Sequence, residues 1–188
     1  MRRLSVFNSV SVDGYYRTVD GDLSWAHAGG EDPEFADFTA GNASGGGTLL
    51  LGRKTYEMMA SFWPTPMAAA QMPVVARQMN LLPKVVFSRT LARASWQGTT
   101  LEKGELVATV RRLKSEGGSD LVIMGSGSIV APLAAAGLVD ELQLLVVPVA
   151  LGAGRSMFEG LGRPLSLQTR STRAFGNGKL FITYEVRS

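Results

Sequence analysis

Short apolar runs of strand type alternate with segments of helical type along most of this chain, and this alternation restricts the possible folds more than any other feature. We expect strands over residues 3–10, 48–52, 84–88, 120–125 and 140–151. Helical patterns lie between or beside them, over residues 32–43, 53–62, 67–80, 105–116 and 128–137. Asp32 is the expected N-cap of the first helix, because Pro33 suits the first helical position. Alternating strands and helices of these lengths predict an α/β sandwich.

The last part of the chain has a different pattern. Residues 165–187 alternate apolar and polar positions on both sides of "GNGK", where Asn177-Gly178 suits a tight turn. The sheet is therefore expected to end in an antiparallel hairpin. With 188 residues, of which 45% are apolar and 19% charged, the chain is predicted to form one domain over residues 1–188.

Composition excludes several kinds of site. The absence of cysteine excludes disulfides, thiolate zinc sites and a cysteine nucleophile, and His27 is the only histidine, so no metal site is expected. The net charge is +3, but the basic residues are scattered rather than clustered, which argues against nucleic-acid binding. No window of 18 apolar residues predicts a membrane span, and residues 1–14 lack the apolar core of a signal peptide. We expect a cytoplasmic protein.

"GSGS" at 125–128 lies between a strand-type run and a helical segment, and these regular flanks argue against a flexible linker. A Rossmann fingerprint would need G-x-G-x-x-G after a first strand, whereas position 130 is Val and this strand comes late in the chain. The chain also has no Walker loop. Two interpretations stay open: a turn whose glycines admit an anion to backbone N–H groups at a helix N-terminus, or a tight turn with no ligand.

Two other expected strand ends carry anion-binding chemistry. Gly52 ends a strand, and Arg53, Lys54 and Thr55 open the next helix, where cations oppose the helix dipole unless they serve an anion. A solvated first turn is the alternative interpretation. Ser88 and Arg89 follow the next strand and offer a hydroxyl and a guanidinium to a phosphate. Three such strand ends favour one extended, multiply phosphorylated ligand lying across the sheet edge.

The stretches "SVDG", "LLLGRKTYE", "KVVFSRTL" and "AGLVDELQLLVVPVALGAGRSMF" together resemble the dihydrofolate reductase-like superfamily. The closest branch is the reductase domain of the bifunctional riboflavin-biosynthesis deaminase/reductase and its stand-alone relatives. This resemblance implies a three-layer sandwich with a mostly parallel eight-stranded sheet and an antiparallel C-terminal hairpin. It also implies a homodimer and NADPH as the hydride donor.

The resemblance assigns residues to the cofactor. Those expected at its phosphates are Gly52, Arg53, Lys54 and Thr55. Ser88 and Arg89 are expected near the adenosine 2′-phosphate. Those expected around the pyrophosphate are Gly125, Ser126, Gly127, Ser128 and Ile129.

The resemblance also suggests substrate-side residues. Asn8 and Trp25 are candidates for substrate binding, and so is Asp37, although an ungapped comparison places Ala36 where dihydrofolate reductases have their acid. The cofactor supplies the hydride, but reduction of a C=N or C=O bond also needs a proton. Asp13, with Ser11 beside it, is the first candidate for the acid or for orienting a water; Asp13 can equally be a turn residue.

The favoured function is an NADPH-dependent reductase of a small heterocyclic substrate. Candidate substrates are 5-amino-6-(5-phosphoribosylamino)uracil and a pterin or folate-like compound, the folate being less favoured because of Ala36. One alternative is a nucleotide-binding or regulatory protein of the same fold without turnover. Another is a structural homodimer whose glycines only form turns.

Overall fold

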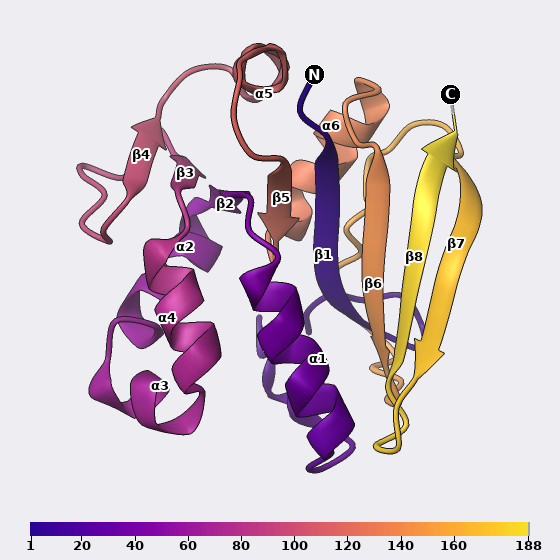
Figure 1. Cartoon of the computed structure of the whole chain (residues 1–188). Coiled ribbons are helices and arrows are strands. Elements are labelled where there is room, and N and C mark those ends of the chain that lie inside the picture. Colours follow the sequence, from indigo (N-terminus) through magenta and orange to yellow (C-terminus); the bar gives the residue numbers. More distant parts are fainter. Residues whose placement is uncertain (188) are drawn as a thin grey trace.

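An eight-stranded sheet forms the centre of the computed structural model, which describes residues 1–187, and helices cover both of its faces (Figure 1). The strands are β1 (Leu4–Ser11), β2 (Thr48–Gly52), β3 (Lys84–Phe87), β4 (Thr99–Glu102), β5 (Leu121–Met124), β6 (Glu141–Val147), β7 (Ser166–Ala174) and β8 (Leu180–Arg187). The α-helices are α1 (Pro33–Ser44), α2 (Arg53–Phe62), α3 (Pro66–Gln71), α4 (Pro73–Leu81), α5 (Leu106–Ser115) and α6 (Val130–Ala135).

The strand order is β4-β3-β2-β5-β1-β6-β8-β7. All pairings from β4 to β6 are parallel, and β8 pairs antiparallel with both β6 and β7. The predicted fold, a mostly parallel sheet with an antiparallel C-terminal hairpin, is therefore confirmed. Because parallel strands place their carboxyl ends at one edge, the loops after β2, β3, β5 and β1 gather there.

The two sheet faces are covered by different helices. α5 and α6 bury Val110, Leu113 and Leu133 against central strand residues such as Val6 and Ile123. On the opposite face, α2 and α4 contribute a second apolar cluster, whose buried members are Leu49, Leu51, Tyr56, Met79, Val86 and Trp96. α1 continues that layer, with the Phe38 ring centroid 4.7 Å from that of Phe181 on β8. Burial of such side chains is the main stabilising term for this sandwich.

The start of α1 is fixed by the residue that the sequence predicts as its N-cap. The Asp32 carboxylate accepts hydrogen bonds from the Phe35 N–H at 3.1 Å and from the Asn177 N–H at 3.0 Å. These N–H groups, Phe35 first, lower the pKa of Asp32. The hairpin turn predicted at Asn177-Gly178 is confirmed, and Gly178 has φ +82°, which glycine adopts without strain. Asp32 thus joins the turn of the C-terminal hairpin to α1.

Proline accounts for two departures from the expected elements. The helix expected over 67–80 is split into α3 and α4, because Met72 precedes Pro73 and has non-helical backbone angles of φ −138° and ψ 64°. The strand expected over 140–151 ends at Val147, because Pro148 has no N–H for a ladder.

Two further elements differ from expectation. The helix expected over 128–137 consists of a 3-10 turn, Gly127–Ile129, followed by α6. The four-residue edge strand β4 was not predicted, because its side chains are at least partly exposed and show little apolar pattern.

Asp140 has a structural role that the sequence did not reveal. Its carboxylate accepts a hydrogen bond from the Leu4 N–H at 2.6 Å and pairs with the buried Lys114 ammonium, which also donates to the Leu138 carbonyl at 2.7 Å. Asp140 therefore joins α5, β1 and the start of β6. Within residues 1–187, no helix is both long and apolar enough to cross a bilayer.

Candidate functional site

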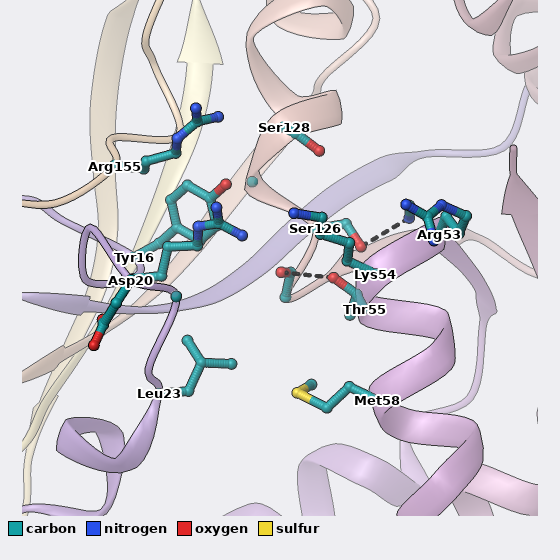
Figure 2. Close-up of a pocket in the computed structure, with 15 residues that line it drawn as sticks. Tyr16, Asp20, Leu23, Arg53, Lys54, Thr55, Met58, Ser126, Ser128 and Arg155 are labelled. Atoms are coloured by element: carbon teal, nitrogen blue, oxygen red, sulfur yellow. Dashed lines mark hydrogen bonds between the residues drawn. The ribbon is translucent and has the colours of Figure 1, made fainter. Parts of the chain in front are cut away.

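Two of the predicted anion-binding loops meet at the carboxyl edge of the sheet. β2 and β5 are paired neighbours, so the loop that opens at Gly52 lies beside the loop that opens at Gly125. The Gly52 N–H donates to the Ser126 hydroxyl oxygen at 3.0 Å, and the Thr55 hydroxyl donates to the Gly125 carbonyl at 3.1 Å (Figure 2). These two hydrogen bonds fix the loops to each other.

The N-terminus of α2 points its cations and N–H groups toward this junction. Gly52 is the N-cap, and no side chain in the described part of the chain caps this helix, so its first N–H groups are available to an anion. Arg53 forms an ion pair with Glu57 one turn later, with Nη1 3.0 Å from Oε1. Glu57 therefore offsets part of the cost of placing Arg53 at the positive end of the helix. Lys54 is exposed beside it.

The glycines of the second loop allow close approaches. Gly125 has φ +62°, and a Cβ there would lie 3.3 Å from Thr55 Cγ2. Gly127 packs against the ring of Tyr16, so a Cβ at that position would lie 2.6 Å from the ring. Any side chain at Gly127 would therefore displace Tyr16.

A cavity of about 610 Å³ lies between these loops and residues from elsewhere in the chain. Figure 2 shows α2 on one side and the segment carrying Tyr16, Asp20 and Leu23 on the other. The lining residues are Tyr16, Arg17, Asp20, Gly21, Leu23, Gly52, Arg53, Lys54, Thr55, Met58, Gly125, Ser126, Gly127, Ser128 and Arg155. The volume lies within the ~300–1,000 Å³ typical of small-molecule sites.

The cavity lining is predominantly cationic. Its charged groups are Arg17, Arg53, Lys54, Arg155 and a single carboxylate, Asp20. The Thr18 hydroxyl and the Asp22 N–H donate to Asp20, and they hold its pKa below the usual value, so it is ionised at neutral pH. Even with Arg53 paired to Glu57, three cations and one anion line the cavity, which favours an anionic ligand.

Ser11 and Asp13, the predicted catalytic residues, do not line this cavity. The Ser11 hydroxyl donates to the Asp13 carboxylate at 2.6 Å, and that carboxylate also accepts from the N–H groups of Leu151 and Gly152, the latter at 2.7 Å. These donors, Ser11 first, lower the pKa of Asp13 to about 2. The Asp13 carboxylate anchors the loop at 151–152, and the roles predicted for Ser11 and Asp13 in delivering a proton or orienting a water stay predictions.

The candidate substrate residues lie outside the lining of this cavity. Asn8 is buried in β1, and its amide nitrogen lies 3.8 Å from the Met157 sulfur. Trp25 is buried in a short 3-10 helix, Ser24–His27, and its indole N–H has no hydrogen-bond partner among residues 1–187. Asp37 is exposed on α1. None of the three contributes to the lining of the cavity.

Ser88, Arg89 and Ile129 also lie outside the cavity lining. Ser88 follows β3, next to the end of β2, and its hydroxyl accepts from the Leu91 N–H at 2.9 Å to close a turn. Arg89 is exposed beside it. Ile129 is buried in the core cluster, so its side chain is structural.

The residues that sequence reasoning missed come mainly from the segment after β1 and from Arg155. Tyr16 and Arg17 follow closely after "SVDG", and Arg155 lies within "LGAGRSMF". Their nearness to these family-like stretches was the only sequence signal that could have identified them. Met58, from α2, is 45% exposed and also lines the cavity.

The structure gives no indication of a metal centre. In the described residues, no three His, Asp or Glu side chains gather in a way that could hold a metal ion. His27 is exposed.

Comparison with known proteins gives relatives along the whole chain. The chain is 28% identical over 185 residues to the uncharacterised protein YyaP of Bacillus subtilis (strain 168), covering 97% of this chain and 94% of YyaP. The crystal structure of a Shewanella sp. PV-4 protein named for riboflavin biosynthesis superposes with a TM-score of 0.73 at 25% identity, with 100% of both chains covered.

A more distant structure has the same fold. Dihydrofolate reductase from Enterococcus faecalis, complexed with NADP(H) and RAB-propyl, superposes with a TM-score of 0.64 at 15% identity, covering 99% of this chain and 97% of that one. The family model described as the RibD C-terminal domain matches residues 2–181. The chain therefore belongs to the RibD C-terminal domain family, as its sequence motifs predicted.

Proposed function

We propose that this protein is an NADPH-dependent reductase that acts on a C=N or C=O bond of a small heterocycle. The observation that carries this proposal is the junction of the Gly52 and Gly125 loops, joined by the Gly52–Ser126 hydrogen bond at the edge of a cationic cavity. Membership of the RibD C-terminal domain family supports a reductase-type activity.

The residues of the cavity fit a dinucleotide cofactor. The uncapped N-terminus of α2 suits phosphate groups, and Lys54 and Ser128 add a cation and a hydroxyl. The dihydrofolate reductase of the same fold was solved with NADP(H). Ser88 and Arg89, at the neighbouring strand end, would then contact the 2′-phosphate and favour NADPH over NADH.

The favoured substrate is 5-amino-6-(5-phosphoribosylamino)uracil. The family and the riboflavin-biosynthesis name of the Shewanella relative support it. A pterin or folate-like substrate is the second choice, because α1 offers no buried acid: Ala36 and Asp37 are both exposed. The homodimer that the resemblance implies and the cytoplasmic location expected from the pattern of residues 1–14 stay predictions.

The bound cofactor would supply the hydride, and the chain would position it and exclude water. The Gly52 and Gly125 loops would bind the phosphates, while Leu23 and Met58, which line the cavity from opposite sides, offer apolar surface to a ring (Figure 2). Asp20 is ionised and Asp13 lies outside the cavity lining. We infer that a water molecule in the cavity gives the proton to the heteroatom of the substrate.

The proposal is tested by following oxidation of NADPH spectrophotometrically with the phosphoribosylamino-uracil and with dihydrofolate. We expect turnover with the uracil and at least tenfold less with dihydrofolate. The Ser126→Ala variant, which loses the bond to Gly52, should lower the rate. Saturable binding of NADPH without oxidation by either acceptor would instead support a nucleotide-binding protein without turnover.

A further inference from the structure

Arg17 and Arg155 are held side by side by a short backbone ladder. The Arg155 N–H donates to the Arg17 carbonyl at 2.9 Å, and the Tyr16 N–H donates to the Arg155 carbonyl at 2.9 Å. The hydrogen bonds from Leu151 and Gly152 to Asp13 fix the preceding residues of both segments. The bridge thus fixes the backbones of half-buried Arg17 and exposed Arg155 beside each other.

This pair lies on the wall of the cavity that faces α2. Both side chains line the cavity, and Figure 2 shows Arg155 near Tyr16, on the side away from Arg53. The Nε atom of Arg17 is buried and has no hydrogen-bond partner within residues 1–187. None of the ion pairs in that part of the chain involves Arg17 or Arg155. Because neither guanidinium is ion-paired within residues 1–187 and both side chains line the cavity, the pair can receive an anion that enters the cavity.

The position of the pair identifies the anion. Tyr16, which belongs to the same ladder, packs directly on Gly127, so this wall adjoins the glycine loop assigned to the pyrophosphate. A dinucleotide lying on that loop would have its linking phosphates between the glycines and the two arginines. Guanidinium groups bind phosphate oxygens through paired N–H donors, which a lysine cannot reproduce.

We propose that Arg17 and Arg155 form a second wall of the cofactor site and bind the pyrophosphate from the side opposite the glycine loop. This inference rests on the proposed function, because it takes a pyrophosphate-linked dinucleotide as the ligand. The proposal adds Arg17 and Arg155 to the cofactor-binding residues predicted from the sequence. It also assigns a role to the loop that Asp13 anchors, which is to hold these two arginines in place.

The test is calorimetric titration of the purified protein with three ligands: NADPH, ADP-ribose, which keeps the pyrophosphate, and adenosine 2′-monophosphate, which lacks it. The variants are Arg17→Gln, Arg155→Gln and the double variant. Arg111→Gln is the matched control, because Arg111 is exposed on α5, away from the cavity. Each single variant should weaken NADPH and ADP-ribose about tenfold, the effect of losing one charged hydrogen bond. Binding of adenosine 2′-monophosphate should change less than twofold.

The outcomes separate this inference from the proposed function. If the wild type does not bind NADPH, the proposed function fails. If it binds but the double variant binds NADPH within twofold of the wild type, only the second wall is refuted. An equal loss for adenosine 2′-monophosphate would also refute it, since the arginines would then act through general charge. The Arg17→Lys variant distinguishes loss of the contact from misfolding. If this variant has the unfolding temperature of the wild type but binds NADPH several-fold more weakly than the wild type, the bidentate contact is supported.

Discussion

The contact between Gly127 and Tyr16 yields the sharpest structural prediction. A Cβ at Gly127 would lie 2.6 Å from the Tyr16 ring. Carbon atoms pack at about 3.5 Å or more, so in Gly127→Ala the ring must retreat by about 0.9 Å. Such overpacking costs about 2 kcal/mol, which lowers Tm by roughly 4–8 °C in a chain of this size. Because Tyr16 belongs to the ladder that holds Arg17, NADPH affinity should also fall at least about tenfold.

Thermal unfolding and NADPH titration of four proteins check this reasoning: the wild type, Gly127→Ala, Tyr16→Ala and the double variant. The double variant should regain stability relative to the sum of the single losses, because the added methyl group then enters the space left by the ring. Gly117→Ala is the control, since nothing lies within 4 Å of a Cβ there. A Gly127→Ala variant that unfolds at the wild-type temperature and binds NADPH normally would refute the contact.

Three further predictions concern ionisable groups. Asp140→Asn leaves the buried Lys114 ammonium without its ion pair and should lower the free energy of unfolding, measured by chemical denaturation, by about 3 kcal/mol. If the double variant Lys114→Met/Asp140→Leu is as unstable as Asp140→Asn, this explanation is contradicted. Burial lowers the pKa of Lys84 from 10.5 to about 8, so between these values the unfolded chain binds more protons than the folded one. Unfolding free energy should therefore rise from pH 8 to 10.5 relative to Lys84→Met, and parallel curves would contradict the lowered pKa. Because its pKa is lowered to about 2, Asp13 should not titrate in the pH dependence of the rate between pH 5 and 9. Asp13→Asn should therefore weaken NADPH binding without changing the shape of that pH dependence. If the wild-type rate falls at one end of this pH range and the Asp13→Asn rate does not, Asp13 is supported as the proton donor.

The sequence predicts the phosphate side of the site because that chemistry is local. Gly52 and Gly125 each end a strand-type run, and a mostly parallel sheet places both ends at one edge, so both loops are predictable as parts of one site. That the two strands are direct neighbours comes from the structure. The hairpin turn at Asn177-Gly178 and the cap at Asp32 were predictable for the same reason: each depends on a few consecutive residues.

The opposite side of the site could not be predicted because it depends on contacts between distant loops. Arg17 reaches the cavity only because its backbone pairs with Arg155, 138 positions later, and because Asp13 binds the loop before Arg155. For Asp13 the sequence left two interpretations open, because an Asp-Gly turn and a catalytic acid look alike in sequence. Its three hydrogen-bonding partners, which depend on the distant loop at 151–152, favour a structural role.

The central claim is that the cavity between the glycine loops and the two arginines holds NADPH. The most direct test is a fluorescence titration of the wild-type protein with NADPH and, in parallel, with NADH. We predict saturable binding of NADPH that weakens with added salt, as expected for phosphates held by Lys54 and the arginines, together with weaker binding of NADH. If neither nucleotide changes the fluorescence at high micromolar concentration, the cavity is not a dinucleotide site and the proposed function is contradicted.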